Sequence, residues 1–143
     1  MQTDLLLKNP LFKNFDTTQL AYLQANSKIM ELEADTYLRI QDDNPIDFLV
    51  LLEGEWTMER HLRGIKKPMI FSSNKIGSWH GGIDLVDMMA PATVKTDAAS
   101  KILSIPKKAM NDMIKRNFPI TIHIIKGIKF GAEMFEEILE MQQ

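Results

Sequence analysis

The sequence contains no cysteine, which excludes disulfides, thiolate metal sites and cysteine nucleophiles together. It also lacks an excess of one charge: 17 Lys and Arg stand against 19 Asp and Glu, so no basic field predicts direct nucleic-acid binding. The leucine run at 5–7 is too short for a signal segment or a membrane span. We therefore expect a cytoplasmic protein with neither a nucleic-acid nor a membrane partner.

Signatures of catalysis are missing as well. The three histidines, His61, His80 and His123, are far apart, and none shows the spacing that places two imidazoles on one metal ion. No P-loop, dinucleotide fingerprint or GxSxG motif is present. The sequence therefore predicts no catalytic residue, no metal and no cofactor, and a cupin-type enzyme is the least favoured alternative.

What is present indicates one globular domain over 1–143, since 45% of the residues are hydrophobic. A helical lead-in covers 4–28, and within it Asp16 is the N-cap of the helix that follows. Helices return over 106–143, after Pro106. Between them, 29–105 carries short apolar runs separated by turn signals. We expect strands at 29–33, 37–40, 46–52, 55–61, 68–71, 92–96 and 100–105.

The turn signals favour a particular β architecture. Gly54 and Gly64 lie between predicted strands, where glycine can take the positive φ that a tight turn requires. Regularly spaced short strands with such turns are typical of a sandwich or barrel rather than a parallel α/β sheet. The predicted fold is mainly β, with flanking N-terminal and C-terminal helices.

Five short segments, in order, carry a resemblance to a known family. They are NPLF at 9–12, LLEGE at 51–55, NKIGSW at 74–79, APATV at 90–94 and SKILSIP at 100–106. Their order and spacing resemble the cyclic-nucleotide-binding domains, of the catabolite-activator and protein kinase A regulatory kind, over residues 9 to about 125. The resemblance implies a jelly-roll barrel (a double-stranded β-helix) and a regulatory role in signal transduction.

The resemblance also implies a phosphate-binding cassette, and here the sequence departs from the family. In members that bind cAMP or cGMP, a cassette Glu accepts the ribose hydroxyl and a cassette Arg pairs with the phosphate. Ser78 stands at the Glu position and Ala90 at the Arg position, while Pro91 has no N–H to donate. A buried phosphate without these partners is costly, so we expect weak or no binding of cAMP and cGMP in the usual way.

The segment that replaces the cassette has two interpretations. In the first, Trp79 and His80 contact a ligand, and the glycines let the backbone approach it closely. In the second, which is favoured, Trp79 fills the emptied pocket and the glycines shape a turn. Asp84 and Asp87 indicate that any ligand is neutral or cationic. The candidate ligand-binding residues are Gly77, Ser78, Trp79, His80, Gly81, Gly82, Ala90, Pro91, Ala92 and Thr93.

The C-terminal stretch carries an apolar stripe at helical spacing, which must be buried against something. We predict that Ile124, Ile128, Phe135 and Ile138 form a homodimer contact. The favoured function is a non-catalytic sensor or interaction domain that dimerises through this helix. The alternative is a genuine receptor for a cyclic nucleotide or another small molecule, with an atypical cassette in which Trp79 and Thr93 are the contacts.

Overall fold

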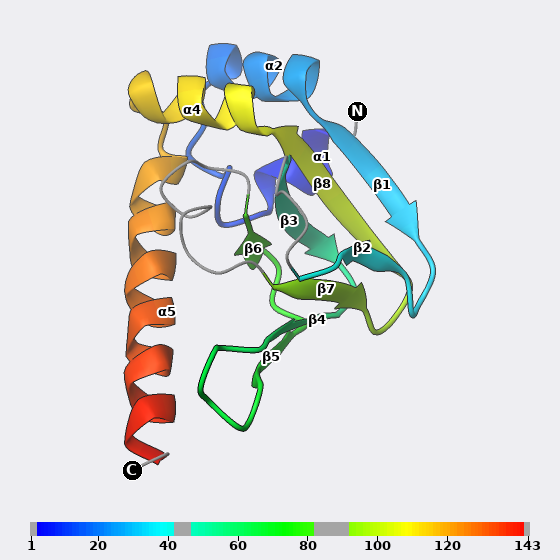
Figure 1. Cartoon of the computed structure of the whole chain (residues 1–143). Helices are drawn as coiled ribbons and strands as arrows, with labels where there is room; N and C mark the ends of the chain where they lie inside the picture. Colours follow the sequence, from blue (N-terminus) through cyan, green and yellow to red (C-terminus); the bar gives the residue numbers. More distant parts are fainter. Residues whose placement is uncertain (1–2, 42–46, 82–91, 142–143) are drawn as a thin grey trace.

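The computed structural model describes residues 3–41, 47–81 and 92–141, without the side chains of Phe135 and Ile138. Helices flank two β-sheets (Figure 1). In chain order the elements are α1 (Thr3–Leu7), α2 (Thr17–Asn26), β1 (Lys28–Leu32), β2 (Tyr37–Arg39), β3 (Asp47–Glu53), β4 (Trp56–Arg60), β5 (Met69–Ser73), β6 (Trp79–His80), β7 (Thr93–Thr96), β8 (Ser100–Pro106), α4 (Lys107–Lys115) and α5 (Ile120–Met141).

The strands pair antiparallel in two four-stranded sheets, with the orders β1-β8-β3-β6 and β2-β7-β4-β5. This is the strand order of a jelly roll, in which the chain crosses repeatedly between two sheets. The predicted mainly β fold with flanking helices is confirmed, and among the described residues the barrel takes the form of a two-sheet sandwich. The predicted strands correspond to β1 to β5, β7 and β8, whereas β6 was not predicted, because two residues are too few to show an alternation.

The apolar run of β3 is buried on both faces, because this strand lies between two layers. Phe48, Val50 and Leu52 pack in one cluster with the helices, and Leu49 and Leu51 pack in a second cluster between the two sheets. Alternating residues of a strand point to opposite faces, so a strand in this position must be apolar throughout. The core therefore has two layers, one on each side of the first sheet.

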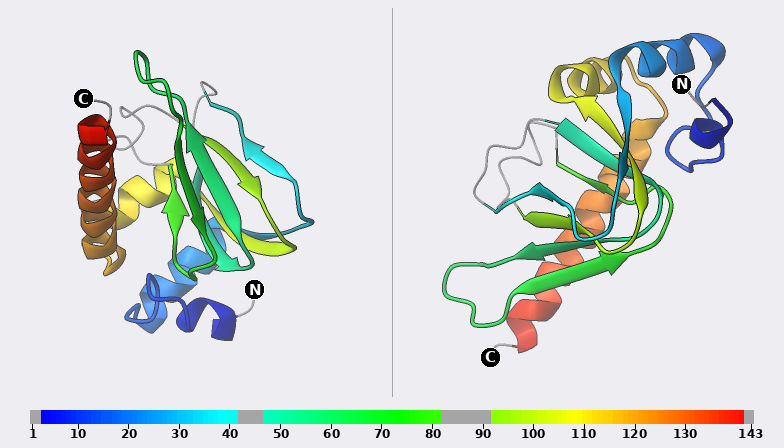
Figure 2. Two further views of the ribbon diagram at one scale, coloured as in Figure 1. Left: turned by 90° about the horizontal axis from the view of Figure 1, so that it is seen from below. Right: turned by 90° about the vertical axis from the view of Figure 1, so that its right-hand side faces the viewer.

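The helices begin where the sequence predicts. Asp16 caps α2 in a capping box, in which the Gln19 amide N donates to Asp16 Oδ1 (2.8 Å) and the Asp16 amide N donates to Gln19 Oε1 (3.0 Å). Pro106 precedes α4, and α5 begins directly after Pro119. Helices α2 and α4 lie at one end of the sandwich, while α5 runs along its side (Figures 1 and 2).

In the described ranges, every helix is too short or too polar to cross a membrane. The predicted turns at Gly54 and Gly64 both have positive φ, of 107° and 80°. The assignment of 1–143 to one domain stays a prediction.

Candidate functional site

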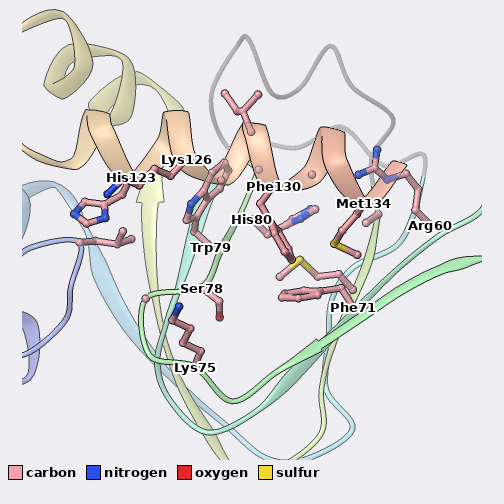
Figure 3. A pocket seen from close by; sticks show the side chains of 18 of the residues that line it. Arg60, Phe71, Lys75, Ser78, Trp79, His80, His123, Lys126, Phe130 and Met134 are labelled. Carbon is pink, nitrogen blue, oxygen red and sulfur yellow. The ribbon is translucent and has the colours of Figure 1, made fainter. Parts of the chain in front are cut away.

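A cavity of about 670 Å³ lies between the sandwich and α5 (Figure 3), a volume in the range of small-molecule sites. The N-terminal loop, β2, β4, β5, the segment around β6 and α5 all contribute to its wall. Its apolar lining includes Met58, Met69, Phe71, Trp79, Phe130 and Met134. Its basic lining comprises Arg39, Arg60, Lys75 and Lys126, together with His80 and His123.

Most of the described candidate residues lie at this cavity. Its lining includes Gly77, Ser78, Trp79, His80, Gly81 and Ala92. Thr93 is on β7 but is not part of this lining, and its hydroxyl accepts a hydrogen bond from the Gln41 amide N (2.8 Å). Gly82, Ala90 and Pro91 lie outside the described residues, as do Asp84 and Asp87.

Ser78 forms hydrogen bonds within the chain through its hydroxyl oxygen and its backbone groups. Its hydroxyl accepts from the Trp56 indole Nε1 (2.9 Å), and its backbone N–H and C=O pair with Lys75 and Leu51. The residue at the family's Glu position therefore anchors the buried Trp56 and the chain beside β3.

Trp79 is a packing residue that also forms a wall of the cavity. Its ring stacks on Phe48, with centroids 5.1 Å apart and planes inclined by 24°. On its other side it lies so close to Gly127 of α5 that a Cβ atom added there would collide with the indole. Trp79 thus fixes the distance between the first sheet and α5 (Figure 3).

The His80 side chain lies on the opposite face of β6 from Trp79, toward the space between the two sheets. It pairs with Leu49 across β3 and β6, so it shares the inter-sheet face of that residue, whereas Trp79 pairs with Val50 and shares the helix-facing side. The ring is partly buried, and its Nε2 has no hydrogen-bond partner among the described residues. Burial, followed by the positive charges of Arg39 and Arg60, lowers the pKa of His80 to about 3.

Arg39 reaches the cavity because β2 is irregular. The pairing register with β7 shifts between Tyr37 and Arg39, and Arg39 then stands opposite the buried Val94. Its Nη2 donates to the backbone C=O of Asp47 (3.1 Å). Gly81, at φ 66°, lies directly against this guanidinium, and a Cβ atom added at 81 would collide with Nη1. The positive φ favours glycine here, and a side chain at 81 would also displace the Arg39 guanidinium from this position.

Arg60 reaches the cavity by regular alternation along β4. Trp56 and Met58 belong to the inter-sheet cluster, and Arg60 is the next residue on the same face. Its Nε is buried and has no acceptor among the described residues, and none of their carboxylates forms an ion pair with it. Burial lowers the pKa of this guanidinium, because desolvation disfavours its charged form.

The described part of the lining is basic, while Asp84 and Asp87 lie outside the described residues. Asp84 and Asp87 predicted a neutral or cationic ligand, but the described lining of the cavity contains no Asp or Glu and carries four basic side chains. Sequence reasoning missed Arg39 and Arg60. The alternation in W-T-M-E-R indicates that Arg60 shares the buried face of β4 with Trp56. No sequence pattern predicts the register shift that turns Arg39 inward.

The other two histidines lie apart from His80. His61 is exposed and lies 3.5 Å from the Glu59 carboxylate. His123 borders the cavity from α5, and burial, followed by the charges of Lys126 and Lys13, lowers its pKa. In the described part of the chain, no three His, Cys, Asp or Glu residues are placed to hold a metal ion.

The predicted dimer stripe is turned toward the chain itself. Ile124 is only 4% exposed and belongs to the helix-facing core, and Ile128 packs against the same core. Ile124 is therefore engaged within the chain, whereas Ile128 is partly exposed, and the contact between two chains stays a prediction. The side chains of Phe135 and Ile138 lie outside the described part. Exposed apolar residues of α5 include Ile122 and Ile125.

Neither a family model nor a curated protein matches this chain. Solved structures do. The sensor domain of the transcriptional regulator DNR from Pseudomonas aeruginosa superposes with a TM-score of 0.68 and 20% identity, over 90% of this chain and 91% of that one. Catabolite activator protein from Thermus thermophilus superposes with a TM-score of 0.68 and 10% identity, over 92% of this chain and 62% of that one.

The regulatory domain of Toxoplasma gondii PKA, solved with cAMP, gives a TM-score of 0.59 and 18% identity, over 76% of this chain and 41% of that one. This chain therefore spans less than two thirds of the last two proteins. The fold is that of the cyclic-nucleotide-binding domains.

Proposed function

We propose that the chain is a non-catalytic sensor domain whose ligand site is the cavity between the sandwich and α5. The observation that carries the proposal is the cavity itself: about 670 Å³, apolar on most sides, with a small set of basic groups converging on it. Support also comes from the fold, since one structure of similar fold is the sensor domain of a transcriptional regulator.

Occupancy of the cavity can be tested with a neutral apolar dye, N-phenylnaphthylamine. Its fluorescence should rise on binding to the wild-type chain. Gly131→Phe should abolish the rise, because Gly131 lines the cavity and the space that its Cβ would enter is open. Ile125→Phe, on the exposed side of the same helix, should retain it. A wild-type chain that gives no rise, or a Gly131→Phe chain that keeps it, would overturn the proposal.

The proposal includes that cAMP and cGMP do not bind in the usual way. The position that resembles the cassette Glu is Ser78, whose hydroxyl is already bonded to Trp56, and the position that resembles the cassette Arg is Ala90. Isothermal titration calorimetry with cAMP and cGMP should therefore give no binding in the micromolar range. Micromolar or tighter binding would contradict this part of the proposal.

A second candidate function is a cyclic-nucleotide receptor that uses an atypical cassette. The presence of Arg39 and Arg60 in the cavity favours it, because guanidinium groups pair well with phosphate. The same titration decides between the two candidates. If cAMP binds to the wild-type chain and Arg60→Gln removes the binding, the receptor with substituted arginines is correct.

The proposal also includes a homodimer formed through α5. Since Ile124 is buried in the chain's own core and Ile128 packs against that core, we assign the contact to Ile122 and Ile125, which lie one helical turn apart and are 51% and 57% exposed. Sedimentation equilibrium should show a dimer that Ile125→Asp converts to a monomer. Ile40→Asp, at a 49% exposed position outside α5, should leave it intact. A monomeric wild-type chain would overturn the assignment.

A further inference from the structure

We infer that the ligand of this cavity is an amphipathic organic anion, whose acid group lies among Arg39, Arg60 and His80 and whose apolar body lies along the methionine and phenylalanine side chains toward α5. This inference rests on the proposed function, because it names the class of ligand for the same site.

The acid end follows from the position of Arg60. A guanidinium taken out of water loses hydration energy that only a partner can restore, and its buried Nε has no acceptor among the described residues. An oxyanion at this point would accept from Nε and from an Nη in the parallel arrangement that guanidinium groups favour. The described wall of the cavity therefore lacks an acceptor for Arg60 Nε, and an anionic ligand would supply one.

Arg39 on β2 and His80 on β6 contribute to the same end of the cavity as Arg60. All three side chains line the cavity, and the Arg39 guanidinium lies directly against Gly81, the residue that follows His80. The positive charges of both arginines act on the His80 ring, which agrees with this placement at the inter-sheet end of the cavity. Two cations in a region of low dielectric repel each other, and an anion between them is attracted by both. His80 remains neutral there, and its buried Nε2, which has no partner in the described part, is placed to donate to the anion or to accept from a protonated acid group.

The apolar end follows from the remaining wall. Met58, Met69, Phe71, Phe130 and Met134 line the cavity from β4, β5 and α5, and Phe71 meets Phe130 edge to face at 5.6 Å (Figure 3). An inorganic ion would leave this wall uncovered and most of the volume unused. Methionine side chains adapt to flexible or irregular apolar groups, so an acyl chain or a small aromatic body fits them.

The test displaces N-phenylnaphthylamine from the wild-type chain with three compounds that share a ten-carbon chain: decanoate, decanol and decyltrimethylammonium. Decanoate should displace the dye at a concentration at least about tenfold lower than decanol, which corresponds to one charge-assisted contact of about 1.4 kcal/mol. Decyltrimethylammonium should be the weakest competitor. Inorganic phosphate, which has no apolar body, should not displace the dye at the concentrations at which decanoate does.

Arg60→Gln supplies the decisive variant, with Arg63→Gln as its matched control. Both remove one guanidinium, but Arg63 is exposed on the loop between β4 and β5 and does not line the cavity. Arg60→Gln should remove the advantage of decanoate over decanol, and Arg63→Gln should keep it. The thermal midpoint of ligand-free Arg60→Gln should equal or exceed that of the wild type, because the variant no longer desolvates a guanidinium whose Nε has no acceptor among the described residues. A folded variant is therefore available for the binding measurement.

The outcomes separate the two proposals. If the dye does not bind to the wild-type chain, the sensor cavity itself is refuted. If the dye binds but decanol or decyltrimethylammonium competes as well as decanoate, the cavity stands and the anionic ligand is refuted. If phosphate competes as well as decanoate, the apolar half of the inference is wrong. If Arg60→Gln keeps the preference for decanoate, the placement of the acid group is wrong.

Discussion

His80 lies beside two guanidinium groups, and its protonation is tied to folding. Its pKa is about 3 in the folded chain, against 6.5 as the ordinary value. Between these values the unfolded chain binds a proton that the folded chain does not, so the stability that the neutral ring contributes is complete above pH 6.5 and is lost as the pH falls toward 3.

This predicts a measurable effect of His80→Gln, which removes the titration. The loss of stability between about pH 7 and about pH 4.5 should be smaller in His80→Gln than in the wild type, as measured by urea denaturation. His61→Gln serves as the control, because His61 is exposed, and it should follow the wild type. If His80→Gln and the wild type lose the same stability over this pH range, the His80 ring is not held neutral by its surroundings.

Gly81 offers a second test at the scale of single residues. Gly81→Ala places a methyl group against the Arg39 guanidinium at a φ of 66°, whereas Gly64→Ala meets a similarly unfavourable φ of 80° with no atom within 4 Å. Both variants should lose stability, Gly64→Ala by about 1 kcal/mol and Gly81→Ala by more. The difference in their free energies of unfolding measures how closely Arg39 is packed. Equal losses would mean that Arg39 moves away without cost.

How far single residues can be predicted depends on whether their strand is regular. Arg60 follows from alternation, because Trp56 marks the buried face of β4 and Arg60 lies four residues further on that face. The same rule fails for Arg39: Leu38 packs into the inter-sheet cluster, yet its neighbour Arg39 is buried too, because the register shifts there. A shift of register comes from the pairing partner, which a single strand sequence does not show.

At the scale of elements, α5 carries two glycines with opposite consequences. A helical glycine costs about 1 kcal/mol relative to alanine, so both substitutions gain helix propensity. Gly127→Ala should nevertheless destabilise the chain, because its Cβ would collide with Trp79, while Gly131→Ala should stabilise it by up to about 1 kcal/mol, because nothing lies within 4 Å. Guanidinium denaturation of the two variants provides the measurement. A stabilising Gly127→Ala would show that α5 is not held against Trp79.

The sequence predicts which elements form better than it predicts what covers them. Apolar periodicity correctly predicts helices over the C-terminal stretch that follows Pro106, but it does not distinguish a stripe that packs on the same chain from one that packs on a partner. Ile124 and Ile128 were assigned to a partner, but Ile124 belongs to the chain's own core and the partly buried Ile128 packs against it. Gly127, in the middle of the same segment, was the available sign of a close approach, since glycine inside a helix is unfavourable unless something requires it.

At the scale of the whole molecule, the cavity lies between two parts that pack on each other, so a ligand there should tighten their contact. Decanoate at saturation should raise the thermal midpoint and slow amide hydrogen exchange along α5, from His123 to Met134, more than along α2. Hydrogen exchange with mass-spectrometric detection measures both helices in one experiment. Protection spread equally over α2 and α5 would indicate global stabilisation without a specific effect on α5.

The position of β8 has a consequence for how the chain is made. It pairs with β1 on one side, as in Lys28 with Ser104, and with β3 on the other, as in Val50 with Leu103, so the first sheet is joined by the last strand of the chain. A nascent chain that ends before Ser100 leaves β1 without the one strand that pairs with it among the described residues, and it leaves one edge of β3 open to pairing with other chains. Until β8 leaves the ribosome, the first sheet therefore cannot form completely, and its unpaired strands are the part of the nascent chain most open to aggregation.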